Sequence, residues 1–193
     1  DMSAGRVTYN DAYFRKYLDY ENTAVGIALN AGRLAMLKRH CPAHGRVLDY
    51  GAGCGTFVRM AREAGYRARG YDINPATVEA LAKMGAYSEA FSEFDTVTFW
   101  DSLEHIECPG RALSRIHESA HVLAAIPIFA DLRRIRESKH YRPGEHLYYW
   151  TAGGFIGWMK TQGFRFIEGS GHEVEAGRAS IGAFAFVCER HQS

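Results

Sequence analysis

The stretch RVLDYGAGCGTF, residues 46–57, combines a short apolar run with an acid and three glycines. The run that contains Asp49 predicts a buried strand, and the residues after the glycines predict an amphipathic helix. Gly51, Gly53 and Gly55 stand between the two, where glycine lets a ligand approach the main chain beside a helix N-terminus. A tight turn without a ligand is the alternative, but three glycines cost chain entropy that a bare turn rarely requires.

The composition is that of a globular protein. The chain has 193 residues, 47% of them hydrophobic, and a formal net charge of +1 at pH 7, so there is no strong nucleic-acid signal. None of the four cysteines is spaced as a CxxC pair, so neither a zinc ribbon nor a disulfide framework is expected. No apolar run reaches transmembrane length and the first residues lack the apolar core of a signal peptide, so we expect a cytoplasmic protein. The sequence gives no indication of the oligomeric state.

Strand and helix patterns alternate along most of the chain, which predicts a mostly parallel sheet with helices on both faces. Helices are predicted over residues 10–22, 23–40, 56–65, 74–85, 110–120 and 151–163. Strands are predicted over residues 46–50, 67–72, 95–100, 121–127, 164–174 and 179–189, while residues 86–91 hold a short strand or none.

The predicted fold is α/β: a Rossmann-like, mostly parallel seven-stranded sheet with helices on both faces, preceded by N-terminal helices. The last two predicted strands are joined by a short glycine-containing connection, so they must form an antiparallel hairpin. We expect a single domain over residues 1–193, with a helical cap over 1–44 and the Rossmann-like core over 45–193. Residues 128–150 are long and mix charged with aromatic side chains, which indicates a lid or substrate loop.

Two acids narrow the ligand of the glycine-rich turn. Asp49 stands two residues before the first glycine, where a carboxylate disfavours a pyrophosphate and suits a cation. Asp72 ends the next predicted strand, where nucleoside-binding α/β folds carry an acid for the ribose hydroxyls. A ribose, a positive charge and close main-chain contact together fit S-adenosyl-L-methionine (SAM). An NAD-dependent Rossmann oxidoreductase and a non-catalytic SAM-binding module are the alternatives.

Three motifs carry a resemblance to a known family. VLDYGAGCG at residues 47–55 and GYD at residues 70–72 resemble motifs I and II of the class I SAM-dependent methyltransferases. DTVTFWDSLEHI at residues 95–106 is similar to the fourth strand and following turn of the ubiquinone-biosynthesis O-methyltransferase subgroup. The resemblance spans roughly residues 28–190 and includes the final helix and hairpin. It implies methyl transfer from SAM to a small or medium-sized acceptor, with oxygen as the accepting atom.

The resemblance also implies a cofactor site. Asp49 would orient the ammonium group of SAM, and Asp72 would accept hydrogen bonds from the ribose hydroxyls. Ile73 would pack on the adenine, and Trp100 would close over the cofactor near the reacting methyl group. Arg33, in the segment LNAGRL, would pair with the cofactor carboxylate; the alternative is a surface cation on an amphipathic helix. The full predicted set is Arg33, Asp49, Gly51, Ala52, Gly53, Asp72, Ile73 and Trp100.

The segment DSLEH supplies candidate catalytic residues. If it is helical, Asp101, Glu104 and His105 lie at positions i, i+3 and i+4 and share one face. Such a face could hold a divalent cation or supply a general base. Some ubiquinone-biosynthesis enzymes bind magnesium through a Glu-x-x-Glu-His motif here, although this chain has Asp in the first position. The alternative is that Asp101 caps the turn, Glu104 is solvated and His105 packs on the strand edge.

The acceptor side is expected in residues 128–150. His140, Tyr141 and His146 are the candidate substrate-binding residues. The basic run RRIRESK at residues 133–139 could meet an anionic acceptor, and a solvated helix face is the alternative. The expected partner is therefore a small-molecule acceptor.

Overall fold

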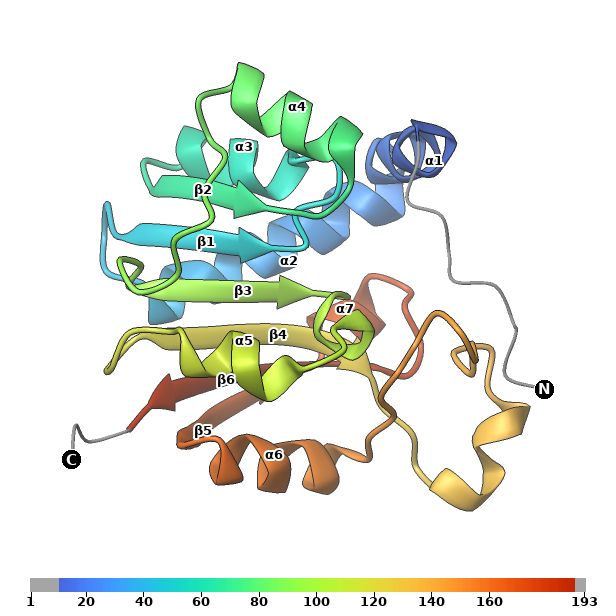
Figure 1. Cartoon of the computed structure of the whole chain (residues 1–193). Helices are drawn as coiled ribbons and strands as arrows, with labels where there is room; N and C mark the ends of the chain where they lie inside the picture. The colour runs from blue at the N-terminus through green and yellow to red at the C-terminus, as the bar shows by residue number, and fades with distance from the viewer. Residues whose placement is uncertain (1–10, 190–193) are drawn as a thin grey trace.

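The computed structural model describes residues 11–189, in which six strands form one mixed sheet with helices packed against it (Figure 1). The strands are β1 (Arg46–Tyr50), β2 (Arg67–Tyr71), β3 (Thr96–Trp100), β4 (His121–Pro127), β5 (Phe164–Ser170) and β6 (Ile181–Cys188). They lie in the order β2-β1-β3-β4-β6-β5. The first four strands pair in parallel, and β6 runs antiparallel to both of its neighbours. The predicted Rossmann-like arrangement, with antiparallel strands at the C-terminal end, is confirmed.

Helices surround the sheet and precede it. They are α1 (Asp11–Glu21), α2 (Ala24–His40), α3 (Thr56–Glu63), α4 (Pro75–Lys83), α5 (Pro109–Ser114), α6 (Ala152–Thr161) and α7 (His172–Glu175), with short 3-10 turns η1 (Leu103–His105) and η2 (Leu132–Glu137). Local chemistry explains their starts: the Thr23 side chain accepts a hydrogen bond from the Gly26 amide at 3.1 Å, and Asn74 caps α4 before Pro75. The helix predicted over 110–120 is limited to the span of α5.

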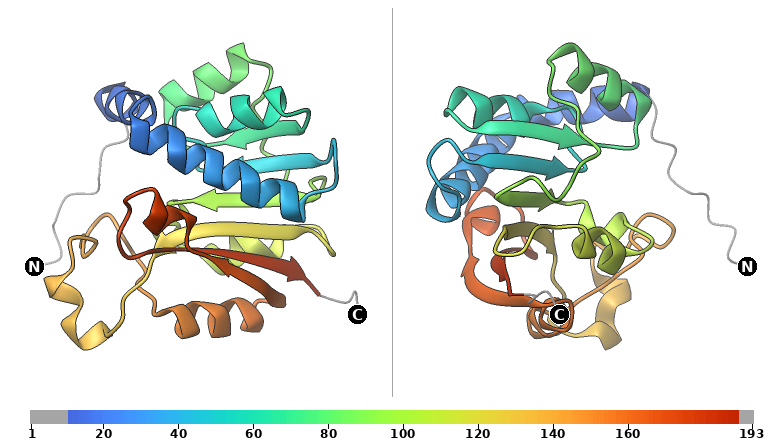
Figure 2. Two further views of the ribbon diagram at one scale, coloured as in Figure 1. Left: turned by 180° about the vertical axis from the view of Figure 1, so that it is seen from behind. Right: turned by 60° about the vertical axis from the view of Figure 1, so that its left-hand side comes forward.

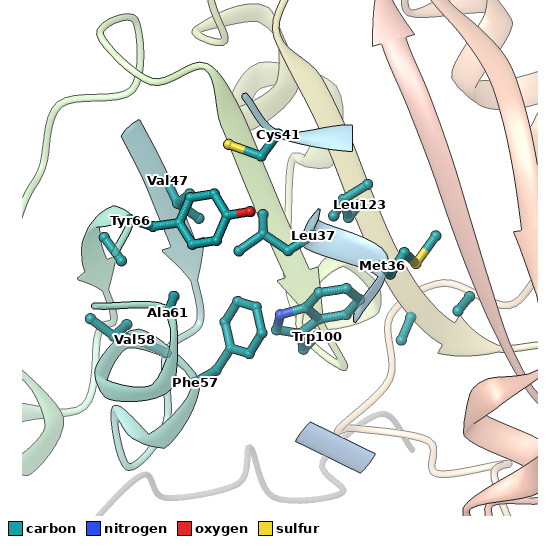
Figure 3. Close-up of a cluster of buried hydrophobic side chains, with 14 of the residues drawn as sticks. Met36, Leu37, Cys41, Val47, Phe57, Val58, Ala61, Tyr66, Trp100 and Leu123 are labelled. Atoms are coloured by element: carbon teal, nitrogen blue, oxygen red, sulfur yellow. The ribbon is translucent and has the colours of Figure 1, made fainter. Parts of the chain in front are cut away.

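Apolar side chains form a core on each face of the sheet. In β4, Leu123 and Ala125 pack with α2 and α3, whereas the alternate residues Val122, Ala124 and Ile126 pack with α5 and α6. Figure 2 (left) shows α2 running across one face, and Figure 3 shows how Met36 and Leu37 of α2 meet Trp100 there. β3 lies in the middle of the sheet and is buried along its whole length. The carboxyl end of β3 is therefore held in a fixed position, and the side chains that follow it are held with it.

The prediction of seven strands is wrong, because the described residues form six. The segment 86–91 makes only one isolated bridge, between Tyr87 and Gly70 of β2. The chain then bends, and the Ser88 hydroxyl accepts a hydrogen bond from the Ala90 amide at 3.3 Å. A local side-chain hydrogen bond of this kind competes with the strand ladder.

The C-terminal connection also differs from the prediction. β5 and β6 are antiparallel, as expected, but a loop that contains α7 joins them instead of a short turn. This loop folds back toward α2 and buries Glu173 completely. The extra length therefore brings new charged residues to the carboxyl end of β3.

Residues 1–10 and 190–193 of the predicted domain lie outside the described residues. Within 11–189, none of the four cysteines is in a disulfide bond. No helix in the same range has the length and apolar character needed to cross a membrane.

Candidate functional site

The glycine-rich turn connects β1 to α3 at the carboxyl ends of the parallel strands, on the right-hand edge of the sheet in Figure 1. The amides of Gly51 and Ala52 donate hydrogen bonds of 2.8 and 3.0 Å to the carbonyl oxygen of Tyr71, at the end of β2. α1 lies beside the turn, since the Cys54 thiol lies 3.2 Å from the carbonyl oxygen of Phe14. The turn is thus held by β2 on one side and α1 on the other.

The three glycines of the turn have different surroundings. A Cβ atom at Gly51 would lie 2.5 Å from Cβ of Ser102, and one at Gly55 would lie 3.1 Å from Cε of Met84. A Cβ atom at Gly53 would meet no atom of the described residues within 4 Å, although the φ angle of +54° still favours glycine. Protein packing therefore accounts for Gly51 and Gly55, and Gly53 is the glycine that faces open space.

Asp49 lies beneath this turn, with 3% of its surface exposed. The Thr98 hydroxyl donates a hydrogen bond of 2.7 Å to its carboxylate. Burial raises the pKa of Asp49 to about 7, and the Thr98 hydrogen bond offsets only part of that effect. A nearby cation would favour the charged form of this carboxylate.

Asp72 and Ile73 follow β2 and reach the same turn. One Asp72 oxygen accepts a hydrogen bond of 2.9 Å from the Gly53 amide, and the other accepts one of 2.8 Å from the Asn74 amide. Burial nevertheless raises the pKa of this carboxyl above its usual value. Ile73 is a large apolar residue that is 67% exposed. An acid and an unburied apolar side chain therefore lie side by side next to Gly53.

A four-residue ion cluster lies at the end of β3. Asp101 accepts hydrogen bonds from Arg33 at 2.7 Å and from two nitrogens of Arg178 at 2.7 and 2.8 Å. Glu173 accepts one from Arg33 at 2.9 Å and one from Arg178 at 2.7 Å. The Arg33 guanidinium carbon also lies 5.1 Å from the centre of the Trp100 ring. The cluster therefore joins α2, β3 and the α7 loop around Trp100.

This cluster changes the interpretation of two predicted residues. Arg33 is not a surface cation, because only 9% of its side chain is exposed. Burial alone would raise the pKa of Asp101, but the guanidinium groups of Arg178 and Arg33 outweigh it and hold the pKa below its usual value.

The predicted helical face of Asp101, Glu104 and His105 does not form. Asp101 has a left-handed φ angle of 55°, and only Leu103–His105 form a 3-10 turn. The residues that do come together are Glu104, His105 and His146, which each offer one ligand atom within 4.8 Å of the others. Glu104 is not solvated, since 2% of its side chain is exposed. The spacing of residues in the sequence did not reveal this group, because His146 lies far along the chain in residues 128–150.

The electrostatics of this second cluster follow from burial. Burial lowers the pKa of His146 to about 4, with a further contribution from His105, and it also lowers the pKa of His105. The pKa of Glu104 is raised well above its usual value, by burial first and then by the charge of Asp101. Both imidazoles are therefore neutral near pH 7, which is the form that accepts a proton or ligates a metal.

The other candidate acceptor residues lie nearby. The His140 ring is 2.9 Å from the Ala179 carbonyl oxygen, and the Tyr141 ring centre lies 5.5 Å from that of Tyr149. The basic run is a solvated surface: η2 has no buried residue, and Arg133 and Arg134 pair with neighbouring acids.

A protein-family model described as a methyltransferase domain matches residues 19–168, which is more than half of the chain. The chain belongs to this family. It is a SAM-dependent methyltransferase that transfers a methyl group to an acceptor that the family does not specify. The family match therefore supports a methyltransferase over the alternative of an NAD-dependent oxidoreductase. It gives no support for the ubiquinone-biosynthesis subgroup in particular.

Solved structures with the same fold are numerous. A chain of the complex between the Haloferax volcanii Trm112 methyltransferase activator and a candidate methyltransferase has a TM-score of 0.68 and 12% identity, covering 94% of this methyltransferase and 98% of that chain. The Burkholderia thailandensis 1,6-didemethyltoxoflavin-N1-methyltransferase, solved with S-adenosylhomocysteine, has a TM-score of 0.65 and 17% identity, with coverages of 93% and 84%. A candidate histamine N-methyltransferase of Thermotoga maritima has a TM-score of 0.62 and 15% identity, with coverages of 92% and 98%.

These likenesses show the fold of the methyltransferase. No curated protein sequence matches the chain.

Sequence reasoning missed three residues of the site. Glu173 and Arg178 lie in the α7 loop, and Thr98 is the partner of Asp49. Opposite charges in the segment GHEVEAGR were the only available signal for the first two, and charged loops are usually solvated. Thr98 points to Asp49 because the two are paired across β1 and β3, a register that one sequence does not reveal.

Proposed function

We propose that the methyl acceptor is a small or medium-sized molecule and that oxygen is the accepting atom. The observation that carries this proposal is the group of Glu104 and His105, which follow β3, with His146 from residues 128–150. Methyl transfer to a hydroxyl requires removal of a proton as the new bond forms. A neutral imidazole beside a buried carboxylate is suited to that task.

SAM supplies an electrophilic methyl group, and the chain's own residues bind and orient it. A Cβ atom at Gly53 would meet no described atom within 4 Å, which supports a ligand next to the main chain there, and the exposure of Ile73 supports its assignment to the adenine. Asp72 offers carboxylate oxygens for the ribose hydroxyls, while Asp49 favours a positively charged group above it. Gly51 and Ala52 complete the turn under the methionine part of the cofactor.

Arg33 and Trp100 form the wall between the donor and the acceptor. The Arg33 Nε and Nη2 atoms are held by Glu173 and Asp101, which fixes the guanidinium over the indole ring. From this position Arg33 forms an ion pair with the carboxylate of the cofactor, and Trp100 limits the access of water to the methyl group. Asp101 acts as a positioning residue, since both of its oxygens accept hydrogen bonds from arginine.

Residues 128–150 are the acceptor side of the same unit, with α1 and α2 as its cap. His105 is the group that removes the acceptor proton, and Glu104 and His146 hold it. The His105 Nδ1 atom lies 2.9 Å from the Glu145 carbonyl oxygen, so Nδ1 donates and Nε2 keeps its lone pair. His140 and Tyr141 line the approach from the lid.

Carbon-13 labelling of the SAM methyl group tests this assignment. The enzyme is incubated with methyl-labelled SAM and fractions of a small-molecule extract of its host, and the product is examined by NMR. Oxygen, nitrogen and sulfur methyl groups give separate carbon shifts, so a labelled methoxy group is the expected result. A labelled N-methyl or S-methyl product would refute the oxygen assignment and leave SAM-dependent transfer intact.

A further inference from the structure

Two side chains of η1 and one from residues 128–150 form a compact group of potential metal ligands. One ligand atom from each of Glu104, His105 and His146 lies within 4.8 Å of the other two. The Glu104 Oε1 and His105 Nε2 atoms are 3.9 Å apart. Two ligands at about 2.1 Å from a shared cation lie at most about 4.2 Å apart, so this pair already has suitable spacing.

Two atoms of the group are buried and unsatisfied. Glu104 Oε2 and His146 Nδ1 have no hydrogen-bond partner among residues 11–189. Buried polar atoms are nearly always paired, and leaving one unpaired is unfavourable because it loses its hydrogen bonds to water. A bound cation would satisfy both atoms at once.

The two imidazoles are oriented as metal ligands usually are. His105 presents its Nε2 lone pair, because Nδ1 donates to the Glu145 carbonyl oxygen at 2.9 Å. His146 makes a hydrogen bond with the main chain of His140, which leaves the unpartnered Nδ1 atom as its acceptor. A main-chain carbonyl on the second ring nitrogen is the common way to fix the tautomer and orientation of a ligating histidine.

We propose that Glu104, His105 and His146 bind one divalent cation of the borderline class, with Zn²⁺ as its representative. Two imidazole nitrogens and one carboxylate favour such a cation over Mg²⁺, which prefers oxygen ligands. Asp101 is not a ligand, because its oxygens are taken by Arg33 and Arg178. Three protein ligands leave a position open for another molecule.

The role of that open position rests on the proposed oxygen acceptor, whereas cation binding itself does not. An acceptor hydroxyl bound there would have a lowered pKa and would release its proton to solvent, because the Nε2 lone pair of His105 would then be on the cation and His105 would act as a ligand in place of a base. Its oxygen would then form the new bond to the methyl carbon as the carbon–sulfur bond breaks and its electron pair stays on sulfur.

Cobalt(II) is the probe that tests binding. The untagged full chain is stripped with a chelator and titrated with Co²⁺, and the visible d–d absorption is followed without SAM. One Co²⁺ per chain, displaced by Zn²⁺, is the expected result. No visible band, or an intense sulfur-to-cobalt charge-transfer band that places the ion on cysteine, would overturn the proposal.

Two variants locate the ion. His146→Ala should weaken Co²⁺ binding by more than about 100-fold, because even residues that only support a ligand are worth roughly 10- to 100-fold. His140→Ala is the matched control: it removes an imidazole of the same segment whose Nε2 atom lies at the Ala179 carbonyl oxygen. Equal Co²⁺ affinity in the two variants contradicts the proposal.

A thermal melt checks the folding of each variant. If His146→Ala does not fold, Glu104→Gln replaces it, since the amide keeps the size of the side chain. Zn²⁺ should raise the melting temperature of the wild type and of His140→Ala but not that of Glu104→Gln. S-adenosylhomocysteine binding to the stripped protein is measured in parallel, so that loss of the cation site and failure of the proposed methyl transfer remain distinguishable.

Discussion

Arg178 and Asp101 lie 77 positions apart in the sequence and are joined by two charge-assisted hydrogen bonds, of 2.7 and 2.8 Å. The pair fastens the α7 loop to the end of β3. Glu173 of the same loop extends the contact to Arg33 on α2. One ion cluster therefore fixes three segments around Trp100.

Removal of one partner from this cluster should be costly. Arg178→Met leaves Asp101 and Glu173 facing a single guanidinium, and breaking a buried pair typically costs about 3–5 kcal/mol. Because Arg178 is 20% exposed, we expect a loss near the lower end of that range in urea-induced unfolding. Arg133→Met removes an arginine that pairs with Asp131 on the surface, and its unfolding midpoint should stay near that of the wild type. Equal losses in the two variants would show that the cluster does not stabilise the fold.

Replacement of Gly53 tests the cofactor site, and Gly85 provides a matched control outside it. Both have left-handed φ angles, of +54° and +60°, and a Cβ atom at either would meet no described atom within 4 Å. Replacement by alanine should therefore destabilise each variant similarly, by roughly 1–2 kcal/mol. Only Gly53→Ala should reduce S-adenosylhomocysteine affinity, by about tenfold or more, because its methyl group enters the space assigned to the cofactor. If calorimetry gives a similar S-adenosylhomocysteine affinity for both variants, the cofactor does not bind at this turn.

The pKa of Asp49 predicts how cofactor binding depends on pH. Burial raises this pKa to about 7, so the empty protein holds the carboxyl protonated at lower pH, and its contribution to stability falls as pH rises from about 4 to 7. A cationic ligand favours the carboxylate, so SAM affinity should increase as pH rises toward 7, with proton release on binding.

Calorimetry in two buffers of different ionisation enthalpy counts the protons released. Asp49→Asn should abolish the release below pH 7. Asp95→Asn is the control, because Asp95 is a surface carboxylate whose pKa is lowered by Arg46. Release that persists in Asp49→Asn would assign it to another group.

Ile73 should contribute to binding and not to folding. Its side chain is 67% exposed, so Ile73→Ser removes little buried area from the protein itself. Loss of the apolar contact between this side chain and the adenine should reduce the binding free energy by about 1 kcal/mol, which corresponds to roughly fivefold weaker binding. Ile167→Ser is the control, because Ile167 lies on β5 at the opposite edge of the sheet from β2. The prediction fails if the two variants bind S-adenosylhomocysteine equally well.

The sequence predicted most of the fold because its signals were local. The apolar run that contains Asp49 and the alternation of strands with helices each depend on neighbouring residues. The seventh strand was predicted wrongly because its pairing with β2 stops after one residue, where the Ser88 hydroxyl accepts a local hydrogen bond from the Ala90 amide. Only a bridge at Tyr87 forms there.

The site was less predictable because its contacts are long-range. The spacing of Glu104 and His105 indicated a reactive pair, but their partner His146 lies about 40 positions away along the chain. Asp101 was grouped with them on helical periodicity. A left-handed φ angle instead turns it toward Arg33 and Arg178, an orientation that spacing alone cannot reveal.

SAM is expected to bind at the glycine-rich turn with its ribose hydroxyls on Asp72. Isothermal titration of S-adenosylhomocysteine and of NAD into the wild type and two variants tests it most directly. We expect the wild type to bind S-adenosylhomocysteine and not NAD. Asp72→Ala should bind about 10- to 100-fold more weakly, since a hydrogen bond to a charged group is worth about 1.5–3 kcal/mol. Glu79→Ala, which removes an exposed acid of α4 that pairs with Lys83, should bind S-adenosylhomocysteine as the wild type does. Binding of NAD without S-adenosylhomocysteine, or equal affinities in the two variants, would refute SAM binding at this turn through Asp72.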